Sequence, residues 1–328
     1  MTIRYKPILI IGIIILLFLL MDRWYPPRSK EEQKWKPNNV NTDLPSGPKG
    51  KLIKYGYDLI SHTSKYIGPD VANIKMRFAG NNLACQNCHL DGGTKKGGAS
   101  FVGVTNRFPQ FRKRANKVIS IEGRVNGCMQ RSMNGKPLPD SSREMKAFVA
   151  YMKWLSKGVP KKDAKLYKGY PKLNAPDRMA DTLKGKMLFQ KNCAKCHGSN
   201  GQGELNGKNP VDGYRYPPLW GNDTFNNGAG MDRVLKAASF IKGNMPFGVT
   251  EKTQYLTDQQ CYDIAAYVDS HKRPVKSHLA KDFPNKSLKP IDCPYGPYAD
   301  PFPEKQHKYG PFQPIRKYYT SHKKLNTK

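Results

Sequence analysis

Two copies of one five-residue motif constrain this chain more than any other feature. Residues 85–89 read Cys-Gln-Asn-Cys-His, and residues 193–197 read Cys-Ala-Lys-Cys-His. This pattern is the attachment signature of c-type haem, because the two thiols bind one edge of the porphyrin and the adjoining imidazole points at the iron. A zinc site or a redox pair is the alternative, but neither copy has a partner Cys-X-X-Cys at zinc-ribbon spacing. The sequence therefore predicts two covalently attached haem c groups, held by Cys85, Cys88, His89, Cys193, Cys196 and His197.

The spacing of the two motifs predicts two cytochrome c-type haem domains in tandem, in a mainly α-helical chain of 328 residues. We expect the first domain, with the catalytic haem, over residues 51–158, and the second, with the electron-transfer haem, over 181–273. A polar linker with three prolines is expected at 159–180.

Apolar residues recur at helical spacing within both predicted domains. The expected helices cover residues 51–67, 118–129 and 142–157 in the first domain, and 182–193 and 257–271 in the second. Gly185 and Phe189 lie four positions apart. In small cytochromes c this spacing lets the first and last helices cross closely, which favours the same arrangement here.

The N-terminal residues predict export to the periplasm. Arg4 and Lys6 precede an apolar run at residues 8–21, and no small-residue cleavage site follows that run. We therefore expect residues 1–25 to form a membrane anchor, with a cleaved signal peptide as the alternative, and 26–50 to form a linker. Covalent haem c is attached outside the cytoplasm, which agrees with export.

The net charge of +31 reflects 56 lysines and arginines against 25 acidic residues. Such an excess often indicates nucleic-acid binding, but an exported haem protein rarely meets nucleic acid, and we exclude that partner. Small dianionic substrates, acidic partner cytochromes and an anionic membrane surface are the partners that the charge favours.

The C-terminal residues 274–328 contain proline, lysine and tyrosine without a sustained period, which predicts an extended tail wrapped around the domains. Cys261 and Cys293 have no haem to hold. Because the compartment is oxidising, we expect a disulfide that joins the tail to the last helix of the second domain, with two unpaired thiols as the alternative.

The second axial ligand of each haem determines whether it carries electrons or catalyses. For the second haem, Met245 precedes a proline in a glycine-flanked loop, as distal methionines of cytochromes c do. Met231, Asn244 and Lys242 are the rivals. A thioether ligand raises the reduction potential and suits electron transfer.

The first predicted domain has no Met-Pro loop. Met129 and Met133 could serve as its distal ligand, but Cys128 stands among arginines between His89 and the closing helix. A lone cysteine is most often a small buried hydrophobic residue. A methionine loop in one domain and a cysteine among arginines in the other favours Cys128 as the ligand here.

Residues 128–138 read Cys-Met-Gln-Arg-Ser-Met-Asn-Gly-Lys-Pro-Leu, downstream of a haem motif and a glycine-rich loop. In these features the chain resembles the dihaem c-type thiosulfate dehydrogenases, which also act as tetrathionate reductases. The resemblance runs from about residue 51 to residue 271. It implies His89 and Cys128 as ligands of the active-site haem, and His197 and Met245 as ligands of the electron-transfer haem. Some family members carry a lysine before the methionine, where this chain has Asn244.

Thiosulfate and tetrathionate are dianions with sulfonate groups, which arginine binds through paired charge-assisted hydrogen bonds. The residues available for this role are Ser100, Arg112, Arg114, Arg124, Arg131 and Ser132. The resemblance places Arg114, Ser100 and Ser132 at substrate-contacting positions. Arg112 and Arg131 could instead bind haem propionates.

The sequence therefore predicts a dihaem enzyme that interconverts two thiosulfates and tetrathionate. Cys128 would be both an iron ligand and the sulfur that exchanges with substrate, a reaction related to thiol–disulfide exchange. A periplasmic or membrane cytochrome would donate or accept the electrons. A dihaem carrier without catalysis, with two His/Met sites, and a cytochrome c peroxidase, with an open iron, are the alternatives.

Overall fold

Two closely crossing helices frame the first haem domain in the computed structural model, which describes residues 35–250 and 252–325. Helix α2 (Gly47–Ser61) packs against α6 (Arg143–Ser156). A Cβ atom at Gly56 would lie 2.1 Å from the carbonyl oxygen of Ala147, so only glycine allows this approach. The hydroxyl of Ser142 accepts a hydrogen bond from the Met145 N–H and starts α6. The helix predicted over 142–157 is thereby confirmed.

The second haem domain repeats this plan. Helix α8 (Thr182–Asn192) crosses α11 (Asp258–Asp269), and a Cβ atom at Gly185 would lie 2.1 Å from the carbonyl oxygen of Asp263. Phe189 is fully buried beside the crossing. Thr257 begins α11 with a capping box that includes Gln260. The predicted roles of the Gly185–Phe189 pair and of the closing helix are confirmed.

The opening helix differs from its predicted bounds of 51–67. It begins at Gly47, because Pro48 has the backbone angle suited to a first helical turn, and residues expected in the linker are helical. It breaks at His62 and continues as α3 (Thr63–Ile67). The Thr63 hydroxyl donates to the Leu59 carbonyl at 2.6 Å and accepts from the Cys85 N–H at 3.0 Å, which ties the break to the first haem motif.

The helix predicted over 118–129 is shorter. Val118 belongs to strand β2 (Lys117–Ile119), which pairs antiparallel with β1 (Gln110–Arg112) and places Val118 opposite Phe111. Helix α5 (Ile121–Met129) starts only after Ser120, whose hydroxyl accepts a hydrogen bond from a backbone N–H of the first turn. β-Branched residues suit a strand, and the serine cap separates it from the helix.

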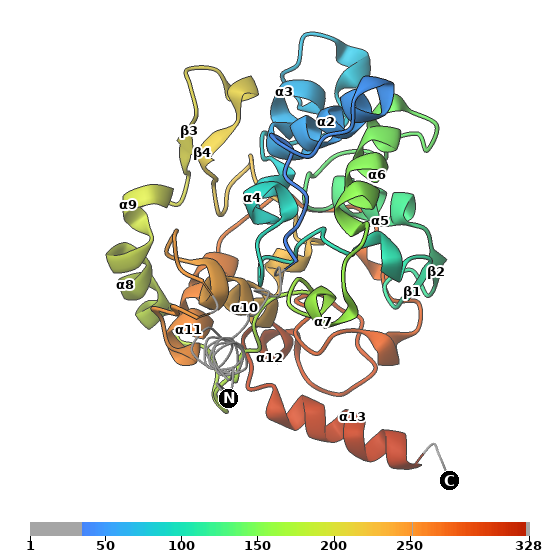
Figure 1. The fold of residues 1–328 in the computed structure, drawn as a ribbon. Helices are drawn as coiled ribbons and strands as arrows, with labels where there is room; N and C mark the ends of the chain where they lie inside the picture. The colour runs from blue at the N-terminus through green and yellow to red at the C-terminus, as the bar shows by residue number, and fades with distance from the viewer. Residues whose placement is uncertain (1–34, 251, 326–328) are drawn as a thin grey trace, which may run out of the picture. The chain divides into compact units, whose positions relative to one another are not determined.

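The remaining elements before the C-terminal tail are short, apart from α10, which packs on α11 in the second domain (Figure 1). The helices are α4 (Leu90–Gly93), α7 (Lys161–Ala164), α9 (Ala194–His197) and α10 (Val234–Asn244), and the second strand pair is β3 (Glu204–Leu205) with β4 (Tyr214–Tyr216). Single 3-10 turns are η1 (Ile74–Met76), η2 (Cys85–Asn87), η3 (Thr105–Arg107), η4 (Pro210–Asp212), η5 (Gly230–Asp232), η6 (Leu279–Lys281) and η7 (Lys286–Leu288).

Hydrogen bonds from three asparagines join the two haem domains. Asn81 donates from its Nδ2 atom to the carbonyl of Thr224 at 3.0 Å, and the Asn82 N–H donates to the Asp223 carboxylate at 2.8 Å. On another side, Asn244 donates to the Gly97 carbonyl at 3.0 Å. The segments on both sides of the first haem motif are thereby bonded to the second domain.

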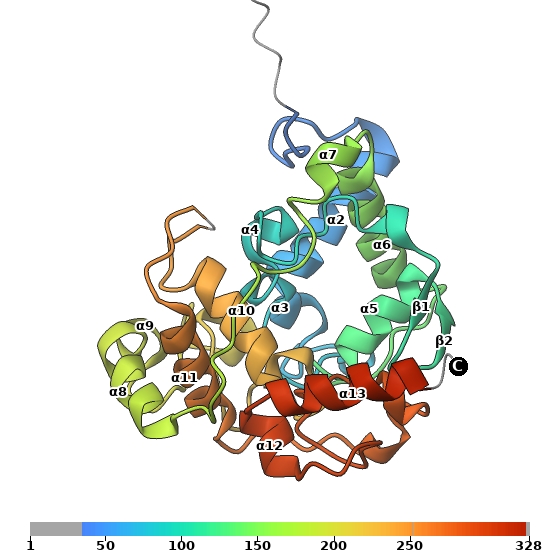
Figure 2. The ribbon, with the colours of Figure 1, turned by 90° about the horizontal axis from the view of Figure 1, so that it is seen from below.

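The C-terminal tail is more ordered than predicted. Residues 274–303 are irregular apart from η6 and η7, but α12 (Glu304–Tyr309) and α13 (Gln313–Leu325) are helices (Figure 2). Phe312 and Ile315 are fully buried in the core of the second domain. The expectation of an extended tail is therefore wrong for residues 304–325. Packing of Phe312 and Ile315 against the second domain stabilises these helices, and the sequence of the tail alone does not show that packing.

The predicted disulfide between Cys261 and Cys293 is also wrong. Both cysteines are free and buried. The Cys261 Sγ lies 3.9 Å from the carbonyl oxygen of Leu256, and the Cys293 Sγ lies 3.8 Å from that of Tyr295. Each thiol is a small buried group with its own backbone acceptor.

The predicted anchor at 1–25 and residues 26–34 of the expected linker lie outside the described part of the chain. In the part that is described, none of the helices has the length and apolar character needed to cross a membrane.

Candidate active site

The first haem motif lies between α2 and the glycine-rich loop that follows it. The ring Nδ1 of His89 lies 2.7 Å from the carbonyl oxygen of Ala99, which leaves Nε2 free to bind a metal. Gly93 has a φ of +87°, and a Cβ atom there would lie 2.1 Å from the ring of Phe101. The glycine-rich loop therefore allows the close backbone packing that holds His89 in place.

Cys128 faces His89 from α5. Its Sγ lies 3.2 Å from Nη1 of Arg124, and its thiol forms a hydrogen bond with the His89 side chain. Burial opposes ionisation of this thiol, but the charge of Arg124 and the bond to His89 outweigh it and lower the pKa to about 6. An imidazole nitrogen facing a stabilised thiolate is a donor pair suited to a haem iron.

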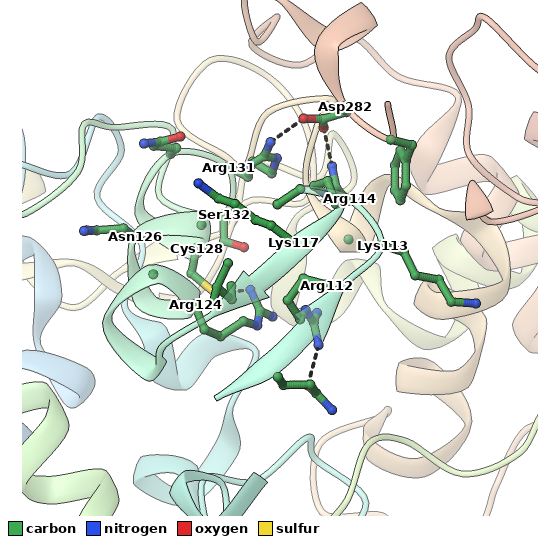
Figure 3. Close-up of a pocket in the computed structure, with 18 of the residues that line it drawn as sticks. Arg112, Lys113, Arg114, Lys117, Arg124, Asn126, Cys128, Arg131, Ser132 and Asp282 are labelled. Carbon is green, nitrogen blue, oxygen red and sulfur yellow. Dashed lines mark hydrogen bonds and ion pairs between the residues drawn. The ribbon is translucent and has the colours of Figure 1, made fainter. Parts of the chain in front are cut away.

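A cavity of about 960 Å³ opens around this pair. Its walls include Cys88, His89 and Cys128, together with basic side chains: Arg112, Lys113, Arg114, Lys117, Arg124, Arg131, Arg233, Lys236 and Lys281. Figure 3 labels Arg112, Lys113, Arg114, Lys117, Arg124 and Arg131 among them. The cavity size is within the range of small-molecule and cofactor sites. Its charge suits an anionic ligand.

Arg114 and Arg131 are already paired within the protein. Asp282, from the C-terminal tail, accepts from Nη1 of Arg114 at 2.7 Å and from Nη2 of Arg131 at 2.6 Å (Figure 3). Arg114 also donates to the carbonyl of Gly228 and to the hydroxyl of Tyr295. Burial alone would raise the pKa of Asp282, but the two guanidinium charges outweigh it and lower that pKa. Both arginines therefore hold the tail against the cavity.

The two serines predicted at substrate-contacting positions differ in their placement. Ser132 lines the cavity, and so does Arg112, whose guanidinium donates to the side chain of Gln110 at 3.1 Å. Ser100 is buried, its hydroxyl donates to the Gly93 carbonyl at 2.5 Å, and it is absent from the described cavity wall. Ser100 thus fixes the loop whose Ala99 carbonyl orients His89.

Several cavity residues were missed in the sequence, among them Asp282, Lys236 and Tyr170. Asp282 stands in a tail without recognisable pattern, and Lys236 lies on a helix of the second domain. Tyr170, from the interdomain linker, is half-buried and lines the cavity, and desolvation raises its pKa. Only the folded chain brings these residues to Cys128, and no local signal in the sequence identifies them.

A second cavity, of about 640 Å³, surrounds the other haem motif. Cys193, Cys196, His197 and Met245 line it together with mainly apolar residues. The ring Nδ1 of His197 lies 2.8 Å from the carbonyl oxygen of Pro217, so its Nε2 is free. This set of two thiols, one imidazole and one thioether fits a c-type haem.

The rival ligands for this second site are differently placed. Lys242 pairs with Asp258 at 2.5 Å, and Asn244 is buried with its Nδ2 atom bonded to carbonyl groups. Met231 lines both cavities, as does Cys88. Met245 directly follows α10 and lines only the second cavity, a position consistent with its predicted role.

Two helical domains, each with a Cys-X-X-Cys-His motif at a cavity with suitable axial donors, define a dihaem c-type cytochrome. The profile described as "SoxA/TsdA, cytochrome c domain" matches residues 75–160, and "Cytochrome c" matches residues 182–272. Two covalently bound haem c groups follow from these two domains.

Sequence relatives make the assignment more specific. The thiosulfate dehydrogenase of Stutzerimonas stutzeri is 40% identical over 237 residues, covering 72% of this chain and 72% of that protein. The thiosulfate dehydrogenase of Allochromatium vinosum is also 40% identical over 237 residues, covering 71% of this chain and 82% of its own. This chain belongs to the thiosulfate dehydrogenase family, a family of oxidoreductases.

A solved structure agrees with this assignment. The thiosulfate dehydrogenase TsdBA from Marichromatium purpuratum, in its as-isolated form, superposes with a TM-score of 0.66 at 32% sequence identity. The match covers 76% of this chain and 52% of that one, so this chain spans about half the length of the solved protein.

Proposed function

We propose that this protein interconverts thiosulfate and tetrathionate at Cys128. In the oxidative direction two thiosulfate dianions join through a new S–S bond and release two electrons, and no proton is gained or lost. The observation that supports this most is the placement of Cys128, which faces His89 in a basic cavity and contacts Arg124 at 3.2 Å.

Cys128 performs the sulfur chemistry in this proposal. Its thiolate attacks the central S–S bond of tetrathionate, forms a mixed disulfide between Cys128 and thiosulfate, and releases one thiosulfate. Two electrons then cleave that mixed disulfide, which releases the second thiosulfate and restores the thiolate. Thiosulfate oxidation follows the same steps in reverse. Arg124 stabilises the negative sulfur throughout, because its guanidinium already contacts Sγ.

The surrounding residues bind and orient the substrate. Arg112 and Ser132 line the same cavity and provide donors for sulfonate oxygens. Arg114, engaged by Asp282, shapes the wall that the tail forms. Ser100 acts indirectly, because its hydrogen bond to the Gly93 carbonyl fixes the loop whose Ala99 carbonyl orients His89.

The two haem c groups supply one-electron acceptors, one for each electron of the pair. Cys85, Cys88, His89 and Cys128 would hold the first. Cys193, Cys196, His197 and Met245 would hold the second. Cys88 and Met231 line both cavities, which supports electron passage between the two sites.

The protein's surroundings follow from this chemistry. We infer a periplasmic location, where covalent haem c is attached, and a periplasmic or membrane cytochrome as the electron partner. Residues 8–21 would anchor the chain to the cytoplasmic membrane.

Turnover by the purified dihaem protein tests the proposal. We expect activity with thiosulfate and an artificial electron acceptor, with tetrathionate and a reduced donor, or with both. Absence of turnover in both directions, with both haems loaded, would instead support an electron-carrier cytochrome. Peroxide-dependent oxidation of a reduced cytochrome without thiosulfate activity would support a peroxidase.

A further inference from the structure

A lysine from the second haem domain reaches the active-site cavity of the first. Lys236 lies on α10 and lines the cavity together with Cys128 and Arg124. Its side chain passes Gly230, where an added Cβ atom would lie 3.5 Å from the Lys236 Cδ and Cε. Its Nζ stands 5.8 Å from the ring centroid of Tyr170, which also lines the cavity. The ammonium group is therefore held in place on the cavity wall.

Three arginines of this cavity, Arg114, Arg131 and Arg233, have carboxylate partners from the C-terminal tail. Asp282 bridges Arg114 and Arg131, at 2.7 and 2.6 Å. Asp292 pairs with Arg233. These two aspartates pair with three of the cavity's cations, and in the described part of the chain no carboxylate pairs with the others.

The three remaining cations that are half-buried are Arg112, Arg124 and Lys236. Arg112 donates to the neutral side chain of Gln110, and Arg124 to the Cys128 sulfur. Within residues 35–250 and 252–325, none of the three forms an ion pair with a carboxylate. Clustered half-buried cations without carboxylate partners are unfavourable unless an anion joins them.

The mutual repulsion of these cations is visible at Lys236. Burial lowers the pKa of Lys236 to about 8, and the charges of Arg233, Arg124 and Arg112 contribute to this, against a smaller opposite effect of Asp292. An anion bound among these cations would offset their mutual repulsion.

We propose that Lys236, together with Arg112 and Arg124, binds a sulfonate group of the thiosulfate or tetrathionate dianion, so that both haem domains build the active site. This inference rests on the proposed function and adds a binding residue to it. The two sulfonate ends of tetrathionate need more than one cation. The Lys236 ammonium group, with three donors, can bind one end while the guanidinium of Arg112 or Arg124 binds the other.

The test compares Lys236→Met, Lys236→Gln and Lys236→Arg with Lys153→Met, which replaces an exposed lysine on α6. Each dihaem protein is checked by its haem absorbance and thermal midpoint. Steady-state kinetics then give KM and kcat for both anions, and calorimetry gives the Kd of thiosulfate for the oxidised protein. Loss of a hydrogen bond to a charged group predicts a rise of about 10- to 100-fold in KM and Kd for the Met and Gln variants. Lys236→Arg should recover most of the affinity.

Equal Kd values for Lys236→Met, Lys236→Gln and Lys153→Met would overturn the inference. A shifted haem potential with an unchanged Kd would also overturn it, and would assign Lys236 to a haem propionate. If the wild type turns over neither anion, the proposed function fails, but the calorimetric comparison still decides whether Lys236 binds sulfur oxyanions.

Discussion

Replacing Asp282 by asparagine should loosen the C-terminal tail from the first haem domain. Asp282 is the shared acceptor for Arg114 and Arg131, and the Tyr295 hydroxyl donates to the same carboxylate at 2.9 Å. Asparagine has nearly the same shape but only one acceptor oxygen and no charge. One guanidinium would therefore keep an acceptor, the amide oxygen. The other would face the amide NH2 group and lose its hydrogen-bond partner.

The size of the effect follows from how buried the three side chains are. Their exposed fractions are 11% for Asp282, 15% for Arg131 and 24% for Arg114. Breaking a buried ion pair from one side costs about 3–5 kcal/mol, and exposed pairs contribute about 0–1 kcal/mol. Arg114 keeps its bonds to the Gly228 carbonyl and the Tyr295 hydroxyl, so most of the loss is at Arg131. We expect Asp282→Asn to lower the free energy of unfolding by about 2–3 kcal/mol.

Urea unfolding of the dihaem protein, followed by far-ultraviolet circular dichroism, measures this change, and limited trypsin cleavage shows whether the tail is released first. Asp177→Asn is the matched control, because Asp177 is exposed. If the two variants unfold at the same urea concentration and resist trypsin equally, then Asp282 does not hold the tail and the reasoning is refuted.

Three further predictions concern pH, packing and redox potential. The pKa of Asp282 is lowered in the folded protein, so its stabilisation is present above the unfolded value of about 3.9 and is lost as pH falls through the folded value. The stability difference between wild type and Asp282→Asn should therefore shrink in acid titrations below about pH 4, and a difference that grows there would contradict this sign. Gly185→Val should destabilise the second domain by about 1–3 kcal/mol or more in thermal unfolding, since even a Cβ atom would lie 2.1 Å from the Asp263 carbonyl oxygen. Met245→His should lower the potential of the second haem in a redox titration and leave the first unchanged; an unshifted second potential would show that Met245 is not its ligand.

Local signals in the sequence were sufficient for the haem motifs and the main helices. The Cys-X-X-Cys-His motifs require particular residues at fixed spacing, and Ser142 and Thr257 start their helices by bonds within the first turn. The crossing at Gly185 was predictable for a similar reason, because the close approach needs a residue without a side chain.

Features that depend on residues far apart in the sequence could not be predicted. The tail helix α13 is amphipathic but mostly polar, and Phe312, just before it, becomes a core residue only against the second domain. The expected disulfide failed because leftover cysteines in one compartment need not be neighbours, and Cys261 and Cys293 are buried as free thiols. Arg114 was predicted as a substrate contact. Its bond to Asp282 could not be predicted, because the two residues are 168 positions apart in the sequence.

Turnover by Cys128→Met, measured against wild type with thiosulfate and an artificial acceptor, tests the central claim most directly. Methionine retains a sulfur that can face His89 but cannot form a mixed disulfide with thiosulfate. Our account predicts that this variant, with both haems loaded and its fold intact, loses thiosulfate oxidation and tetrathionate reduction together. Full turnover by Cys128→Met would show that the sulfur chemistry takes place elsewhere.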